Sequence, residues 1–167
     1  WQLEQFLSDI IMAAKLSPEE TLWDLYCGTG SITLPASKLV KNTFGVELSA
    51  GSIDDARANA ERNGISNVQF FAEDLHKPAA LAILQSLPSP DVIIIDPPRA
   101  GVHTTLLEHI LEVAPPRLVY VSCNPATQAR DIQLLDEKYK VAAIQPVDMF
   151  PHTQHVENVI LLQKKSV

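Results

Sequence analysis

The sequence contains few cysteines and no long apolar run. Among its 167 residues there are two cysteines, Cys27 and Cys123, which lie far apart and form no Cys-x-x-Cys pair. This excludes a zinc ribbon or an iron–sulfur centre built from this chain alone. No run of about 18 apolar residues is present, so we expect no membrane span. With no export signal in view, we expect free thiols and a cytoplasmic location.

Positive charge is also scarce. The chain has 13 lysines and arginines against 20 aspartates and glutamates, which gives a formal net charge of −7. Such a surface, taken alone, favours a soluble enzyme with a small-molecule substrate, because nucleic-acid phosphates attract faces rich in lysine and arginine. If RNA is the substrate, we expect much of the attraction to come from a part of the protein outside this chain.

Apolar residues at helical spacing open the chain. Residues Trp1–Leu16 carry them at Leu3, Phe6, Leu7, Ile10, Ile11 and Ala14, which predicts an amphipathic helix. Because this helix begins without a cap and the first residue is not methionine, we interpret the chain as a C-terminal piece of a longer protein. Its length fits a single domain over residues 1–167, and we expect a monomer.

Short apolar runs that favour β-strands alternate with helical stretches along the rest of the chain. The strands are expected at Thr21–Tyr26, Thr43–Glu47, Val68–Ala72, Asp91–Asp96, Leu118–Ser122, Val141–Pro146 and Val156–Gln163. The helices are expected at Ser31–Lys41, Ala50–Asn63, Thr104–Val113 and Ala126–Lys138. This alternation predicts an α/β fold with a doubly wound, mostly parallel seven-stranded sheet. Ligands of such sheets bind beyond the carboxyl ends of the strands, near the point where the strand order reverses.

A glycine loop follows the first expected strand. It reads Tyr-Cys-Gly-Thr-Gly, and Gly28 and Gly30 allow the backbone to turn tightly and to approach a ligand closely. A dinucleotide loop needs a third glycine three residues after Gly30, where this chain has Thr33. The loop is therefore a poor match to a nicotinamide site, and by itself it is a weak signal, for which a plain tight turn is the alternative.

Acidic residues follow the next two strands. Glu47 ends the second strand, where a carboxylate can accept hydrogen bonds from both ribose hydroxyls of an adenosine. Asp74 follows the third strand, where it can accept from an adenine amino group. Each acid alone could be a solvated helix cap, but together they suit a cationic sulfonium better than an anionic pyrophosphate. The pattern favours S-adenosylmethionine as the cofactor.

The fourth and fifth strands end in groups that can carry chemistry. Asp96 and Arg99 lie on an Asp-Pro-Pro-Arg loop, which the two prolines make rigid. Cys123 lies where the fifth strand emerges, and Asn124 and a proline stop the strand directly after it. A nucleophile would be held rigidly at such a place. The alternatives are that Asp96 caps a turn and that Cys123 is a small core residue.

The last expected strand begins with a glutamate. Glu157 can act as an acid or base if partial burial raises its pKa, although it could also be a solvent-facing strand end. Just before it, His152 and His155 form a His-x-x-His pair. No third ligand is indicated, so we expect no metal.

A thiol, a carboxylate and a sulfonium cofactor form the set required to methylate C5 of uracil. This carbon is too weak a nucleophile to attack a methyl sulfonium directly, but a thiolate added to C6 places electron density on C5. After methyl transfer a base must remove the C5 proton so that the thiolate can leave.

Four segments of the chain closely resemble the RNA uridine-C5 methyltransferase family. They are Asp-Leu-Tyr-Cys-Gly-Thr-Gly, Asp-Pro-Pro-Arg-Ala-Gly, Ser-Cys-Asn-Pro-Ala-Thr and Phe-Pro-His-Thr-x-His-Val-Glu, in this order. The resemblance implies a Rossmann-like class I methyltransferase domain with an antiparallel last strand and S-adenosylmethionine as cofactor. It implies RNA as substrate, and the forms of the last two segments favour the ribosomal-RNA branch over the transfer-RNA branch.

The resemblance also assigns roles to individual residues. It implies Cys123 as nucleophile, Glu157 as base and Asp96 as a catalytic and cofactor-lining residue, with the cofactor held by Tyr26, Gly28, Gly30, Glu47 and Asp74. Arg99 and Asn124 are expected to contact the RNA. Family members carry N-terminal RNA-binding domains, often an iron–sulfur cysteine cluster, and a glutamine motif before the first helix. None of these is present in this sequence.

Two other functions remain open from the sequence. An amino-group methyltransferase can use an Asp-Pro-Pro loop to orient an exocyclic amine and needs no nucleophile. A non-catalytic module that binds the cofactor or RNA is the alternative from another class. A cytosine-C5 enzyme is disfavoured because that class places Pro-Cys after the fourth strand, where this chain has Pro97 and Pro98.

Overall fold

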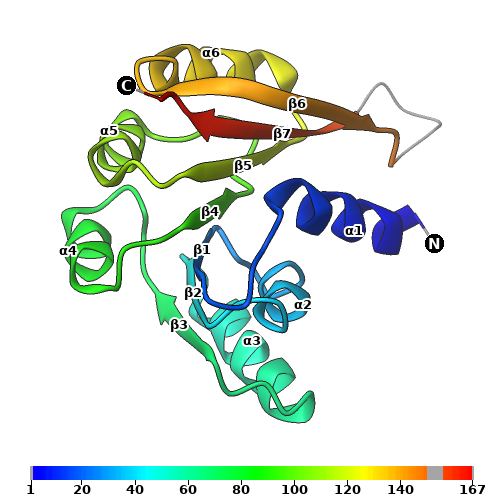
Figure 1. The fold of residues 1–167 in the computed structure, drawn as a ribbon. Coiled ribbons are helices and arrows are strands. Elements are labelled where there is room, and N and C mark those ends of the chain that lie inside the picture. Colours follow the sequence, from blue (N-terminus) through cyan, green and yellow to red (C-terminus); the bar gives the residue numbers. More distant parts are fainter. Residues whose placement is uncertain (1, 150–155, 167) are drawn as a thin grey trace.

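The computed structural model describes residues 2–149 and 156–166, and these form a seven-stranded sheet with helices on both faces (Figure 1). Its strand order is β3-β2-β1-β4-β5-β7-β6. The strands are β1 (Thr21–Leu25), β2 (Asn42–Glu47), β3 (Val68–Ala72), β4 (Val92–Ile95), β5 (Arg117–Ser122), β6 (Tyr139–Val147) and β7 (Glu157–Lys164). Strands β1 to β5 are parallel, and β7 runs antiparallel to both of its neighbours. The predicted fold class is therefore confirmed.

The helices form two layers that enclose the sheet (Figure 1). One layer contains α1 (Gln2–Ala14), α2 (Thr33–Ser37) and α3 (Ala50–Arg62), and the other contains α4 (Pro78–Ser86), α5 (Thr104–Val113) and α6 (Pro125–Leu135). The central strands alternate between the layers. In β4, for example, Ile94 packs in the core beneath α1, and its neighbour Ile93 packs beneath α4 and α5. Burial on both faces explains why these strands are continuous apolar runs.

The two largest differences between the structure and the predicted elements are at helices. Helix α4 was not predicted, because within Pro78–Ser86 only Ala80 and Leu84 are fully buried and two positions make a weak periodic signal. Helix α2 is much shorter than the predicted Ser31–Lys41. The Asn67 side chain donates to the carbonyl oxygens of Ser37 and Val40 at 2.7 and 3.0 Å, so it occupies acceptors that a longer helix would use.

The first strand ends where the site begins. Tyr26 has a left-handed backbone with φ of 67°, so β1 stops one residue earlier than predicted. The backbone N–H groups of Tyr26 and Cys27 both donate to the carbonyl oxygen of Val46, at 2.9 and 3.1 Å. This turn lies between β2 and β4, which flank β1 where the strand order reverses, and it places the following loop at the carboxyl edge of the sheet.

Candidate functional site

A cavity of about 420 Å³ lies at this edge of the sheet. Its lining residues come from the loops after four strands and are Tyr26, Glu47, Leu48, Asp74, Leu75, His76, Asp96 and Pro98. Four predicted cofactor-binding residues, Tyr26, Glu47, Asp74 and Asp96, are thus brought together around one space. The predicted Gly28 and Gly30 are not among its lining residues, although Gly28 donates its N–H to Glu47.

The glycine loop and the two acids are fixed by backbone hydrogen bonds. Glu47 accepts from the N–H of Gly28 at 3.2 Å through Oε2 and from the N–H of Ser49 at 2.9 Å through Oε1. Asp74 accepts from the N–H of His76 at 2.9 Å through Oδ1. Carboxylate oxygens have two lone pairs each, so both acids keep acceptor capacity toward the cavity. The arrangement can bind hydroxyl and amino groups.

Two buried polar groups at the end of the first strand lack a hydrogen-bond partner among the described residues. The Tyr26 hydroxyl is one of them, and burial raises the pKa of Tyr26 to about 12. The other is Oδ1 of Asp24, a fully buried residue in β1 whose Oδ2 accepts from the Thr33 hydroxyl. Burial raises the pKa of Asp24 to about 7. The sequence analysis missed Asp24, although an acid within the buried Thr-Leu-Trp-Asp-Leu strand is an unusual feature that could have revealed it.

The register of the sheet brings the predicted reactive residues together. The antiparallel β5–β7 pairing ends at Ser122 opposite Asn158; Cys123 is the residue after this end of β5 and Glu157 is the first residue of β7, so both adjoin the same last pair. Both side chains are half-buried. Asp96 follows β4, the neighbour of β5 on its other side. Burial, and after it the nearby charge of Glu157, raises the pKa of Asp96 to about 7. A thiol and two adjacent carboxyl groups therefore meet at one edge of the sheet.

The two predicted RNA contacts, Arg99 and Asn124, are neighbours in the structure. The Asn124 side chain accepts from the N–H of Ala126 at 3.2 Å and so caps helix α6. Its amide also donates to the carbonyl oxygen of Arg99 at 3.1 Å, as does the Thr127 hydroxyl at 3.1 Å. These bonds tie the segment after Cys123 to the Asp-Pro-Pro-Arg loop, and the contact of both residues with RNA stays a prediction.

A buried carboxylate on α6, also missed by the sequence analysis, completes this connection. Asp131 is fully buried and accepts through Oδ2 from the N–H of Val102 and from the Tyr120 hydroxyl, both at 2.7 Å. Gly101 has φ of 83°, and a Cβ there would lie 2.5 Å from the same oxygen, so this position requires glycine. Gln128 shares the buried helix face with Asp131 and donates to the carbonyl oxygen of Tyr120 at 2.9 Å. Helical spacing of these polar residues with the buried Leu135 is the signal that could have found them.

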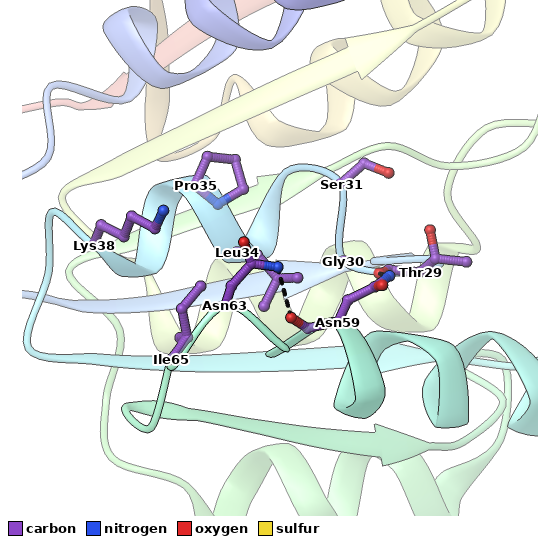
Figure 2. A pocket seen from close by; sticks show the side chains of 9 residues that line it. All are labelled: Thr29, Gly30, Ser31, Leu34, Pro35, Lys38, Asn59, Asn63 and Ile65. Carbon is purple, nitrogen blue, oxygen red and sulfur yellow. Dashed lines mark hydrogen bonds between the residues drawn. The ribbon is translucent and has the colours of Figure 1, made fainter. Parts of the chain in front are cut away.

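A different cavity, of about 300 Å³, lies between α2 and the end of α3 (Figure 2). Figure 2 shows Lys38 and Pro35 of α2 on one side and the loop residues Thr29 and Ser31 on another. Asn63 donates to the carbonyl oxygen of Asn59 at 2.8 Å across its floor. Among the described residues that line this cavity, Gly30 is the one predicted site residue. The same lining residues include no carboxylate and no thiol. We therefore do not assign the site there.

Two further predictions concern metals and membranes. His152 and His155 lie outside the described residues, and the described residues contain no cluster of three or more His, Cys, Asp or Glu side chains suited to hold a metal ion. Both cysteines are free thiols, Cys27 buried and Cys123 half-buried. Within the described ranges, no helix has the length and apolar character needed to cross a membrane.

Comparison with known proteins identifies the family. Residues 4–165 match the model of the family described as tRNA (uracil-5-)-methyltransferase. An uncharacterized RNA methyltransferase from Bacteroides thetaiotaomicron is 53% identical over 90% of this chain and 33% of its own length, and one from Protochlamydia amoebophila is 42% identical over 96% and 37%. The chain thus spans about a third of the length of these curated relatives.

Solved structures agree with this result. The tRNA (uracil-54, C5)-methyltransferase of Pyrococcus abyssi, in complex with S-adenosyl-L-homocysteine, is 34% identical, with a TM-score of 0.83 over 97% of this chain and 38% of that one. A precorrin-6y C5,15-methyltransferase from Geobacter metallireducens, at 18% identity and a TM-score of 0.78 over 96% of this chain and 88% of its own, shares the fold. With 162 of its 167 residues inside the family match, the chain belongs to the tRNA (uracil-5-)-methyltransferase family.

Proposed function

We propose that residues 1–167 form the catalytic domain of an S-adenosylmethionine-dependent enzyme that methylates C5 of a uridine in RNA. The observation that supports the proposal is that Cys123 and Glu157 both adjoin the last residue pair of β5 and β7, and that the charge of Glu157 contributes to the raised pKa of Asp96. An amino-group methyltransferase has no use for a thiol at this position, whereas C5 methylation requires one beside a base.

The residues around the 420 Å³ cavity fit the proposed cofactor. The carboxylates of Glu47 and Asp74 line the cavity and can accept from ribose hydroxyls and an adenine amino group, and the cavity lining includes no Lys or Arg among the described residues. Acidic walls favour a cation over a pyrophosphate. When bound, S-adenosylmethionine supplies an electrophilic methyl group on a sulfonium.

Three residues of this chain carry the proposed chemistry. The Cys123 thiolate forms a bond to C6 of uracil, and the electron pair of the C5–C6 double bond moves into the enolate. C5 of the enolate then takes the methyl group, and Glu157 removes the C5 proton. The electrons of that C–H bond restore the double bond and expel the Cys123 thiolate. Burial and the charge of Glu157 raise the pKa of Asp96 to about 7, so Asp96 favours its protonated form beside Glu157, which is the proposed base.

We favour ribosomal RNA as the substrate on the form of the Ser-Cys-Asn-Pro-Ala-Thr and Phe-Pro-His-Thr segments, the second of which falls on residues 150–153, outside the described residues. The family description and the Pyrococcus abyssi neighbour name tRNA. Sequencing of modified nucleotides in both RNA classes, from cells with and without the gene, decides between them. Loss of a single 5-methyluridine from tRNA would overturn the ribosomal assignment.

The mechanism is tested by removal of the base. In the intact protein, Glu157→Gln should still allow addition and methyl transfer but should stall elimination. With cofactor and unmodified RNA, a methylated protein–RNA adduct should accumulate and survive denaturing electrophoresis, and it should vanish in the matched Cys123→Ala, Glu157→Gln double variant.

Two results contradict the proposal. Normal turnover of Glu157→Gln would make the glutamate a bystander. Full activity of Cys123→Ala would exclude a covalent step and favour amino-group methylation by the Asp-Pro-Pro loop.

A further inference from the structure

A second cavity, of about 350 Å³, lies directly beside the proposed cofactor cavity. It is bounded by residues 100–104, which continue the Asp-Pro-Pro-Arg loop, and by helix α6. The two cavities share one lining residue, His76. None of the residues predicted to bind cofactor, to bind RNA or to react is among its described lining residues, so the proposed function does not yet use this space.

Two stacked imidazole rings form one wall of this second cavity. His76 and His103 are both exposed, and their ring centroids lie 5.3 Å apart with an angle of 28° between the ring planes. Leu134 of α6, with 46% of its surface exposed, lies on the cavity as well. Flat aromatic faces and an exposed apolar edge are surfaces on which nucleobases stack.

Arg130 supplies a fixed positive charge to the same cavity. Its Nε and Nη2 donate to Asp131 Oδ1 at 2.9 and 2.8 Å, and Nη2 also donates to the carbonyl oxygen of Ala100 at 2.9 Å. These bonds orient the guanidinium plane while 55% of the side chain stays exposed. Nη1 has no acceptor among the described residues and can donate to a phosphate.

The exposed charge in this cavity is positive although the chain as a whole is acidic. The single carboxylate among the described residues of the lining is Asp131, which is fully buried and already accepts from Val102, Tyr120 and Arg130. Asp74 lies behind His76 and accepts its backbone N–H. The accessible groups of the cavity are therefore one cation and two imidazoles.

We propose that this cavity binds a nucleotide that flanks the target uridine, with its base against the His76–His103 pair and its phosphate on Arg130. The inference rests on the proposed function. Position supports it, because the cavity lies at one end of the loop whose other end carries Asp96. The helix that begins just after Cys123 holds both parts of that loop, through Asn124 at Arg99 and through Arg130 at Ala100.

The sharpest test is His103→Asn in the intact protein. Asparagine keeps an acceptor for the N–H of Thr105, which His103 caps at 3.4 Å, but it removes the ring. The KM for RNA should rise roughly 5- to 50-fold, as expected for loss of one stacking surface. The kcat at saturating RNA and the affinity for S-adenosylhomocysteine should not change. Lys38→Ala, in the cavity of Figure 2 on the opposite face of the sheet, is the control and should keep the wild-type KM.

Crosslinking provides a second readout that does not depend on folding of the variant. Wild-type protein is irradiated with RNA carrying 4-thiouridine next to the target, and crosslinks should map to residues 100–104 or to α6. An unchanged KM for RNA in His103→Asn would overturn the proposal, whether or not cofactor binding is weaker. Crosslinks confined to other segments would overturn it as well. Crosslinks at 100–104 without any 5-methyluridine product would refute the proposed function and support the nucleotide site.

Discussion

The two halves of the carboxyl edge are held in place by different means. In the half that lines the 420 Å³ cavity, Glu47 and Asp74 are positioned by backbone N–H groups of their own loops. In the half that contains Cys123, the loops are joined by side chains of α6, namely Asn124, Gln128 and Asp131. The first half leaves carboxylates open to a ligand, and the second half fixes the backbone around the proposed reacting groups. We infer that the cofactor half tolerates adjustment and the reaction half does not.

Each half also contains one carboxyl group with a pKa of about 7, but the environments differ. Asp24 lies fully buried within β1 and is bonded to Thr33, whereas Asp96 lies at a strand end and faces Glu157. Burial is the largest cause in both cases. For Asp96, repulsion by the charge of Glu157 is the second cause of the raised pKa, and it links Asp96 to the proposed base. The raised pKa of Asp24 thus results from its place in the core, whereas the raised pKa of Asp96 belongs to a proposed catalytic pair.

The largest expected effect is on the stability of the reaction half. Asp131→Ala should lower the free energy of unfolding by roughly 2–5 kcal/mol, because the Tyr120 hydroxyl and the N–H of Val102 lose their buried acceptor. Urea unfolding followed by circular dichroism measures it. Asp136→Ala is the matched control on the same helix; it removes an exposed ion pair with Lys165 and should change stability by less than about 1 kcal/mol. Equal losses in both variants would refute the contrast between the two halves.

The next effect concerns Asp24 and the pH dependence of stability. Between pH 3.8, its ordinary pKa, and about pH 7, the folded protein keeps a proton that the unfolded chain has lost. The free energy of unfolding should therefore fall as pH rises through this window, by up to about 4 kcal/mol at 1.36 kcal/mol per pKa unit.

Asp24→Asn keeps an acceptor for Thr33 and should flatten this part of the dependence in urea titrations at several pH values. Asp55→Asn on the exposed face of α3 should retain the wild-type slope. A slope that is the same in all three proteins would show that Asp24 ionises normally in the fold.

The smallest effect is expected in the cofactor half. Asp74→Ala should weaken binding of S-adenosylhomocysteine roughly 5- to 20-fold, which corresponds to the loss of one hydrogen bond to a charged acceptor. Isothermal titration calorimetry provides the measurement. Glu73→Ala removes the adjacent acid, which does not line the cavity, and should bind as the wild type does. If Glu73→Ala were the weaker binder, the assignment of the adenine contact to Asp74 would be wrong.

Most of the fold could be predicted from the sequence because its central strands are buried on both faces. Runs such as Asp91–Asp96 have no alternative amphipathic interpretation, and the helices between the strands fix the parallel arrangement. The candidate site residues Asp96, Cys123 and Glu157 were found for a related reason, since each stands where a strand ends or begins. The strand order β5-β7-β6 comes from pairing between distant segments, so it cannot be read from local patterns. This order brings Cys123 and Glu157 to the same end of the β5–β7 pair.

The polar supports of the site were not predicted because their sequence signal resembles that of a solvated surface. Asp131 and Gln128 belong to a helix in which polar and apolar residues are mixed, and a charged residue at such a place is usually exposed. Their burial becomes evident only when Tyr120 and Gly101 pack against them. Helix α4 was missed for the opposite reason, since it turns few residues toward the core.

The antiparallel direction of β7 has a consequence for how this protein can change over evolution. Along β7, Val159 and Leu161 pack in one core layer and Ile160 and Leu162 in the other. A shift of the strand by one residue would exchange the layers and would also move Glu157 away from Cys123. An insertion or deletion in β7 would therefore disturb both the packing of the core and the proposed position of Glu157 beside Cys123, so we expect selection against it. The loops that carry Glu47 and Asp74 are free of that double constraint, so we expect homologous sequences to vary in length there and not along β7.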